Sequence, residues 1–179
     1  MASRGLDLLR LEGGYAVGNL NSYWAKPLAN GAVVSEDKIE NFTFVEVYFE
    51  NGVRKCKYLT DAKKSDEVFL VTTPERRLPE ETLKDFYNSK GEFARLHILE
   101  KSLRFESSKV TLNSGVTTVK EGFVAHFDPT SKTYIISDPA SAHADYATAG
   151  IKLEVVTIGT ELGYEQGITV YRFEVKKIA

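Results

Sequence analysis

The chain has 179 residues, enough for one hydrophobic core, since a domain of about 150 residues already buries roughly 70% of its unfolded surface. Lys and Arg number 23 against 25 Asp and Glu, and the net charge of −2 excludes the basic footprint of a nucleic-acid-binding protein. The single cysteine, Cys56, excludes an intrachain disulfide and a paired-cysteine metal site.

Neither a signal peptide nor a membrane span is expected. Charged residues interrupt the apolar residues near the N-terminus, whereas a secretory leader has an unbroken apolar stretch. No apolar run approaches the ~20 residues that cross a bilayer. We therefore expect synthesis in a reducing cytosol, no membrane partner, and a buried Cys56 that acts as a small apolar side chain.

Residues 1–40 are rich in Gly and Asn and lack regular periodicity, which predicts an N-terminal arm or wrapping segment before a single β-rich domain over residues 41–179. Two interpretations are open. The segment wraps the domain and packs its aromatic side chains down, which we favour for most of it, or it is an extended arm that reaches a neighbouring subunit. In the second case Tyr15, Tyr23 and Trp24 are the anchors, because Tyr and Trp dominate interface hot spots.

Residues 42–59 predict a β-hairpin around Asn51-Gly52, the residue pair that best tolerates the positive φ angles of a type I′ turn. A two-residue turn fixes the register, and it places Glu46 opposite Lys57. Side chains alternate along a strand, so one face is expected to form the core side: Val45, Val47, Cys56 and Tyr58, with Phe49 near the turn.

Two strands and one helix are expected between residues 60 and 100. Residues 67–73 predict a strand that ends at Pro74, which cannot donate to a ladder. Residues 78–90 predict the helix, because Pro79 suits its first turn, the apolar side chains of residues 83, 86 and 87 form one stripe, and a glycine follows at 91. Residues 92–100 predict a strand with His97 as a structural residue on its mixed face.

The remaining residues predict short strands over 102–107, 109–113, 116–120, 151–158 and 169–175, and a second hairpin over 123–138. Asp128-Pro129 opens the turn of that hairpin. A loop of small residues follows to Gly150 and contains His143 and Tyr146. The expected fold is mainly β: an antiparallel β-barrel or sandwich-like domain with one helix near 78–90.

Two His-x-Asp pairs, His126 with Asp128 and His143 with Asp145, are the residues to weigh as a metal or catalytic site. Residues two apart on a strand share a face, so the pairs could hold a divalent ion through nitrogen and oxygen ligands. Against this, Asp128 is explained by the turn, and nothing in the sequence orients His143. We therefore predict no metal, no cofactor and no catalytic residue, with a small metal-dependent enzyme using these four residues as the alternative.

Residues 122–139, Gly-Phe-Val-Ala-His-Phe-Asp-Pro-Thr-Ser-Lys-Thr-Tyr-Ile-Ile-Ser-Asp-Pro, and the small-residue loop after them resemble structural proteins of tailed-bacteriophage virions. The pattern is most similar to head decoration, or capsid cement, proteins. Residues 4–14, Arg-Gly-Leu-Asp-Leu-Leu-Arg-Leu-Glu-Gly-Gly, also resemble the start of phage structural proteins. The resemblance covers the N-terminal segment and about the C-terminal third, whereas the Asn51-Gly52 hairpin and the expected helix lie outside it.

The resemblance implies a non-enzymatic protein on the virion surface that bridges capsid subunits and stabilises the shell. Its partners would be the major capsid protein and further copies of itself, with a trimer as the family-style state, and neither nucleic acid nor membrane. The candidate interface residues are Tyr15, Tyr23, Trp24, His143 and Tyr146. Another phage head or tail protein and a carbohydrate- or protein-binding β module stay open as alternatives.

Overall fold

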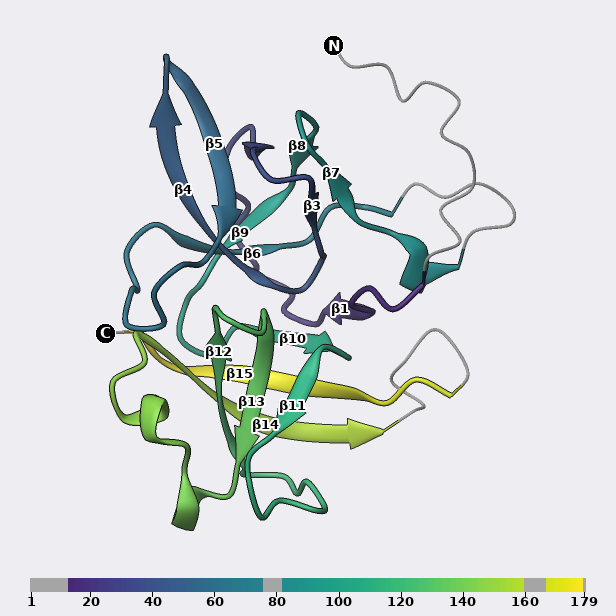
Figure 1. The fold of residues 1–179 in the computed structure, drawn as a ribbon, viewed down its shortest axis with the longest axis vertical. Coiled ribbons are helices and arrows are strands. Elements are labelled where there is room, and N and C mark those ends of the chain that lie inside the picture. The colour runs from purple at the N-terminus through teal and green to yellow at the C-terminus, as the bar shows by residue number, and fades with distance from the viewer. Residues whose placement is uncertain (1–12, 76–81, 160–166, 179) are drawn as a thin grey trace.

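The computed structural model describes residues 13–75, 82–159 and 167–178. Their strands form two large sheets and a two-stranded ribbon (Figure 1). The strand order is β1-β10-β15-β14-β12-β13-β11 in the seven-stranded sheet and β8-β2-β5-β4-β6-β9 in the six-stranded sheet. Most neighbours are antiparallel, but β2 with β5 and β11 with β13 run parallel, so both sheets are mixed.

The elements have the following bounds. The seven-stranded sheet contains β1 (Gly18–Leu20), β10 (Arg104–Ser107), β11 (Val110–Leu112), β12 (Val124–Asp128), β13 (Thr133–Ser137), β14 (Ile151–Gly159) and β15 (Val170–Ile178). The six-stranded sheet contains β2 (Ala32–Val34), β4 (Phe44–Glu50), β5 (Val53–Tyr58), β6 (Val68–Val71), β8 (Phe93–Ala94) and β9 (Leu96–Ile98). The ribbon pairs β3 (Lys38–Ile39) with β7 (Asn88–Ser89), and three short 3₁₀ turns are η1 (Leu83–Asp85), η2 (Pro139–Ser141) and η3 (Ala144–Ala147).

The two large sheets share one core of aromatic side chains. Phe44 of β4 has its ring centroid 5.3 Å from that of Tyr134 on β13 and 5.5 Å from that of Phe127 on β12. Phe105 and Phe173 extend this cluster along β10 and β15. Each sheet ends in edge strands, so within the described residues neither closes on itself, and the sandwich-like form of the predicted β fold is the one observed.

The first hairpin has the predicted register. Asn51 and Gly52 adopt φ of 51° and 76°, as a type I′ turn requires, and Glu46 lies opposite Lys57. Cys56 is buried and free, as predicted. The placement of Phe49 on the core side is wrong: its side chain is 67% exposed, because the tip of β4 and β5 extends beyond the rest of the sheet (Figure 1). The Arg54 guanidinium covers that ring instead, 5.5 Å from its centroid.

The helix predicted over residues 78–90 is wrong in its described part, and residues 76–81 lie outside the described residues. Only the 3₁₀ turn η1 forms, and the carboxylate of Asp85 closes it by accepting from the backbone N–H and hydroxyl of Thr82 at 2.8 and 2.6 Å. The chain then becomes extended. Asn88 in β7 donates its side-chain amide to the carbonyl of Ile39, 2.9 Å away, so pairing with β3 replaces the expected helical turns.

The strand predicted at 116–120 is also wrong. Strand β13 lies between β11 and β12 in the sheet, so the chain after β11 must pass β13 to reach β12. Residues 113–123 make that connection. The strand predicted over 92–100 is broken at Arg95 into β8 and β9, which lie at opposite edges of the six-stranded sheet because β8 pairs with β2 and β9 pairs with β6. The other predicted strands after residue 60 are present, and so is the second hairpin, with β12 and β13 antiparallel.

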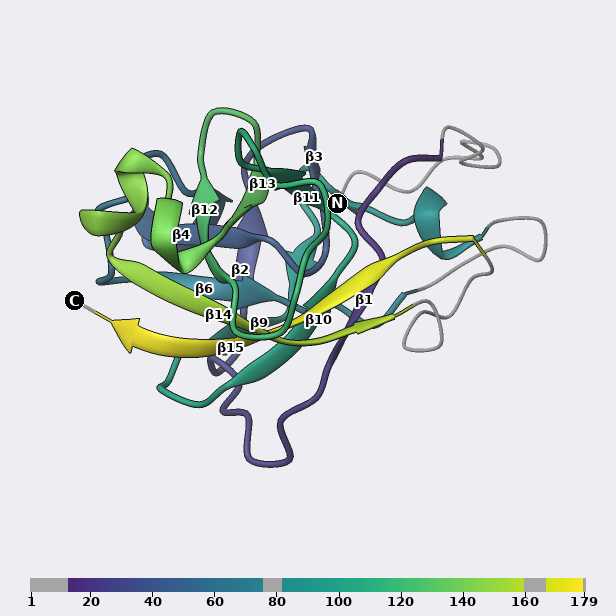
Figure 2. The same cartoon turned by 90° about the horizontal axis from the view of Figure 1, so that it is seen from below.

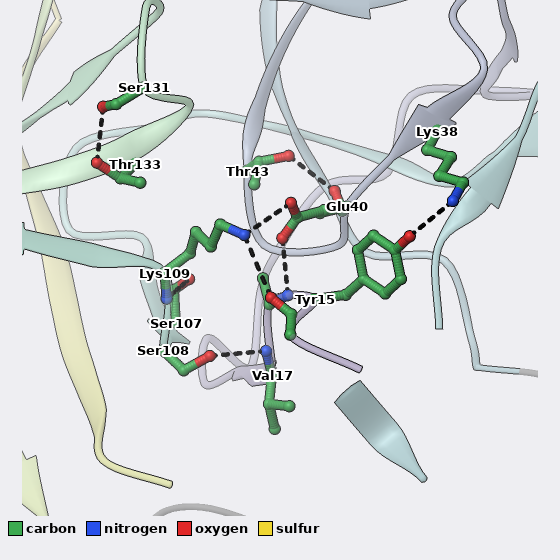
Figure 3. A network of polar contacts seen from close by, with 12 residues as sticks. Tyr15, Val17, Lys38, Glu40, Thr43, Ser107, Ser108, Lys109, Ser131 and Thr133 are labelled. Atoms are coloured by element: carbon green, nitrogen blue, oxygen red, sulfur yellow. Dashed lines mark hydrogen bonds and ion pairs between the residues drawn. The ribbon is translucent and has the colours of Figure 1, made fainter. Parts of the chain in front are cut away.

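Residues 14–17 are fixed between the two sheets by a polar network around Glu40 (Figure 3). The buried Glu40 carboxylate accepts from the Ala16 N–H at 2.8 Å and pairs with the Lys109 ammonium at 3.0 Å. The Val17 N–H donates to the Ser108 hydroxyl at 2.9 Å. Beyond this network, residues 18–39 supply β1, β2 and β3. Most of the described part of the N-terminal segment therefore packs on the chain's own sheets, except for the exposed loop around Tyr23 and Trp24, and residues 1–12 lie outside the description.

Candidate functional site

Tyr23 and Trp24 form an exposed aromatic pair on the loop that follows β1. Their side chains are 90% and 82% exposed, and their rings meet edge to face with centroids 5.0 Å apart. In Figure 2 the segment after β1 loops away from the body of the molecule. Trp side chains are highly buried on average in folded proteins, and Tyr side chains are intermediate. The pair therefore presents apolar area that the described part of this chain leaves open.

Both ends of this loop are anchored to the sheets. The Asn21 N–H donates to the Arg104 carbonyl at 3.0 Å, and the Arg104 N–H donates to the Ser22 hydroxyl at 2.6 Å. At the other end the Ile98 N–H donates to the Lys26 carbonyl at 2.9 Å. These contacts attach the loop to β10 on one side and to β9 on the other. The aromatic pair is thus held at a fixed place where the chain passes from one sheet to the other.

The other predicted interface residues lie elsewhere. Tyr15 belongs to the network near Glu40, where its hydroxyl accepts from the Lys38 ammonium at 2.9 Å and its ring lies 5.0 Å from that of Tyr87 (Figure 3). His143 and Tyr146 lie at η3, which packs against β12. The five residues therefore occupy three places.

His126 on β12 packs against the small-residue loop that contains His143. His126 is 1% exposed, and its ring centroid lies 5.3 Å from that of His143, the residue that caps η3. Nδ1 of His143 is 3.7 Å from a carboxylate oxygen of Asp145. One ligand atom from each of these three side chains lies within 4.8 Å of the others. Three of the four residues weighed from the sequence therefore converge.

Asp128, the fourth residue, stabilises the turn between β12 and β13. Its carboxylate accepts from the N–H groups of Thr130 and Ser131 at 3.0 and 3.1 Å and from the Ser131 hydroxyl at 2.6 Å. These bonds close the β12–β13 turn, as the turn interpretation of Asp128-Pro129 predicts.

His126 has an unusual environment for a buried histidine. Neither ring nitrogen has a hydrogen-bond partner among the described residues. Burial, with the neighbouring His143, lowers the pKa of His126 to about 4, so its ring is neutral near pH 7. An unpaired polar group in a protein interior costs about 1–3 kcal/mol. By contrast, buried His97 is paired through Nδ1 with the Thr72 hydroxyl at 2.6 Å, in keeping with its expected structural role.

Sequence comparison places the chain among prophage proteins. The profile of the YonC prophage protein family matches residues 11–176. The SPbeta prophage-derived uncharacterized protein YonC of Bacillus subtilis (strain 168) is 43% identical over 177 residues, which covers 98% of each chain. No solved structure matches, and among the described residues no helix is long and apolar enough to span a bilayer. The phage origin expected from the sequence is confirmed at this level, and the chain belongs to the YonC prophage protein family.

Proposed function

We propose that this protein is a non-enzymatic structural component of the phage particle, and that it binds the outside of the capsid as a decoration protein. In this role it contacts major capsid subunits and bridges them, and it resides on the virion surface. The prophage family supports the phage setting. The single observation that carries the adhesive role is the exposed pair of Tyr23 and Trp24 on an anchored loop.

The aromatic pair suits an adhesive contact for a physical reason. A Trp side chain can bury about 150–250 Å², and at about 25 cal/mol per Å² this burial stabilises a contact by roughly 4–6 kcal/mol before losses. Because both ends of the loop are hydrogen-bonded to strands, little conformational entropy is lost on binding.

A contact of modest affinity is sufficient for stable binding to a capsid lattice. Each decoration protein that engages two subunits, or that binds as an oligomer, gains avidity from the fixed spacing of the lattice. The aromatic loop supplies one such contact per copy, and self-association into a trimer would present three. Near-neutral net charge also suits a partner made of protein instead of nucleic acid.

A co-sedimentation assay tests this role. Purified protein is mixed with undecorated heads of the phage that encodes it, the heads are pelleted, and the bound fraction is measured over a concentration series. Binding at micromolar concentration is expected. The double variant Tyr23→Ser/Trp24→Ser is expected to bind at least about 30-fold more weakly, which corresponds to loss of one hot spot of 2 kcal/mol. Both side chains are exposed, so the variant keeps its fold.

Phe93→Ser is the matched control, because Phe93 is a 69% exposed aromatic residue on β8 at the edge of the six-stranded sheet. This variant is expected to bind like the wild type. Wild-type protein that stays in the supernatant refutes the decoration role. Equal losses in both variants would show that the contact is unspecific. Binding to purified tails but not to heads would favour the alternative of another virion component.

A small metal-dependent enzyme is the second candidate, since His126, His143 and Asp145 converge. That function requires a bound ion and a substrate. Loss of a measured activity in His143→Ala, with capsid binding unchanged, would separate it from the adhesive role.

A further inference from the structure

The buried imidazole of His126 points to a ligand because of where it lies. Its side chain is almost fully inaccessible, and both ring nitrogens lack hydrogen-bond partners among the described residues. Buried polar groups in native proteins are nearly always paired, so an orphan of this kind needs an explanation. The His143 ring and the carboxylate of Asp145 lie close to it, and both are metal-ligating types.

These three groups lie somewhat farther apart than the ligands of an occupied metal centre. In a tetrahedral site with bonds of about 2.1 Å to nitrogen or oxygen, neighbouring ligand atoms are about 3.4 Å apart. Here they lie within 4.8 Å. Nδ1 of His143 is 3.7 Å from Oδ2 of Asp145 and also accepts from the Asp145 backbone N–H at 3.3 Å, so metal binding through Nδ1 would replace this long capping hydrogen bond. The Asp145 side chain is 68% exposed and can rotate toward the two rings without disturbing the core.

We propose that His126, His143 and Asp145 bind one divalent transition-metal ion, with zinc as the best match. Two imidazole nitrogens and one carboxylate oxygen form a donor set that suits zinc and other late first-row ions better than calcium or magnesium, which prefer oxygen ligands. Three protein ligands leave a further position for water. The inference concerns ion binding alone and does not depend on the capsid role.

The ion would fasten the small-residue loop to the sheet. His126 comes from β12, whereas His143 and Asp145 come from the cap and first turn of η3. The loop is otherwise held by single hydrogen bonds along its length: the His143 N–H donates to the Ser137 hydroxyl at 3.2 Å, the Asn113 side-chain amide to the Ser141 carbonyl at 3.1 Å, the Lys152 ammonium to the Ala147 carbonyl at 2.9 Å, and the Gly150 N–H to the Ala62 carbonyl at 2.8 Å. A metal bridge between these anchors would fix η3 against β12.

Zinc binding to the full-length chain tests the site. Protein stripped with EDTA and dialysed is titrated with zinc by calorimetry, and bound metal is counted by mass spectrometry. One zinc ion per chain is expected. At free zinc of 100 times the dissociation constant, the melting temperature is expected to rise by about 5–10 °C over that in EDTA. Cobalt in place of zinc is expected to give a visible absorption spectrum of a tetrahedral or five-coordinate site.

Two surface variants and one buried variant localise the ion. His143→Ala and Asp145→Asn are each expected to weaken zinc binding at least about 100-fold, because loss of a group that merely supports a ligand already costs about 10–100-fold. In EDTA the melting temperature of Asp145→Asn should match that of the wild type, since this side chain is 68% exposed. That of His143→Ala should be slightly lower, because the variant loses the acceptor that caps η3. His126→Leu is expected to lose the zinc-dependent shift while its melting temperature in EDTA does not fall, because the buried orphan is removed.

Asp37→Asn is the control for nonspecific binding by exposed carboxylates, since this side chain is 89% exposed and belongs to the separate Lys90 pair. It should bind zinc like the wild type. No stoichiometric zinc binding by the wild type overturns the proposal. Zinc binding that persists in both His143→Ala and Asp145→Asn also overturns it, as does tighter binding of calcium than of zinc.

Discussion

The buried ion pair between Glu106 and Arg172 gives the sharpest stability prediction. Glu106 on β10 is 1% exposed and lies opposite Arg172 on β15. One carboxylate oxygen accepts from Nε and Nη2 of Arg172 at 3.0 and 2.7 Å, and from the side-chain amide of Asn21 at 3.1 Å. Among the described residues no second cation lies within ion-pair distance of Glu106. Removing the arginine therefore leaves a buried charge without compensation.

Arg172→Met keeps most of the aliphatic stem and removes two charge-assisted hydrogen bonds. Each such bond contributes about 1.5–3 kcal/mol, and breaking a buried pair by deleting one partner costs about 3–5 kcal/mol. We therefore expect the free energy of unfolding to fall by about 4 kcal/mol. With a urea m-value of about 2 kcal/mol per M for a domain of this size, the midpoint should fall by about 2 M.

Glu106→Gln should cost less, about 1–2 kcal/mol, because it removes the buried charge and leaves an arginine that is 26% exposed to water. The double variant should also lose only about 1–2 kcal/mol, so the two single costs are not additive. Urea unfolding followed by far-UV circular dichroism measures all three variants. Arg104→Met is the matched control, since Arg104 is 51% exposed in its pair with Glu174 and such pairs contribute about 0.2–1 kcal/mol. A cost below 1 kcal/mol for Arg172→Met, or additive costs in the double variant, would refute the reasoning.

Three further predictions concern other buried polar groups. Tyr134→Phe removes the hydroxyl that donates to the Phe42 carbonyl at 3.0 Å in the core, and should lower the free energy of unfolding by about 1–2 kcal/mol in the same assay. Burial raises the pKa of the Glu46 carboxyl, but hydrogen bonds and charges from two lysines outweigh it and hold the pKa below its ordinary 4.5. This carboxylate therefore stabilises the fold above pH 4.5, and the contribution is lost as the pH falls through the lower pKa of the folded state. Between pH 6 and pH 3, the free energy of unfolding should therefore fall less in Glu46→Gln than in the wild type. Burial raises the pKa of the Cys56 thiol to about 12, so a thiol reagent at pH 8 should modify it only after unfolding in urea.

A specific outcome would contradict each of these three predictions. An unchanged midpoint in Tyr134→Phe would mean that the hydroxyl does not bridge the sheets. If the free energy of unfolding of Glu46→Gln and of the wild type fell equally between pH 6 and pH 3, pairing with the lysines would not stabilise the Glu46 carboxylate. Rapid modification of Cys56 in native protein would contradict its burial.

The local elements with strong turn chemistry could be predicted from the sequence. Asn51 and Gly52 dictate positive φ angles and a two-residue loop, so the pairing of Glu46 with Lys57 follows without any tertiary information. Asp128 likewise identifies the second hairpin turn. Phe49 was misplaced because alternation assigns a face but does not show how far the opposing sheet extends.

Elements that depend on distant partners could not be predicted. The spacing of Leu83 and Phe86 is helical, yet the chain after η1 pairs with β3, which lies almost 50 residues earlier in the sequence. Strand pairing over such a separation overrides a weak local propensity. The parallel pairing of β11 with β13 is equally invisible in a sequence, and it turns residues 116–120 into a connection.

The sequence identified the residues of the candidate metal site but not their arrangement. The His-x-Asp pairs mark His126, His143 and Asp145 as possible ligands, but the sequence could not show that η3 returns to β12 or that His126 has no partner. The exposed pair of Tyr23 and Trp24 was an expected anchor, and its exposure became apparent only from the fold.

Quantitative mass spectrometry of purified phage particles tests the proposed structural role most directly. Particles of the phage that encodes this chain are purified by density gradient, and the chain is measured relative to the major capsid protein. The proposal predicts that the chain is present in a fixed ratio set by the capsid lattice, and that particles stripped of it become less resistant to heat or chelation. Abundant protein in the lysate with none in the particles would contradict the proposed role.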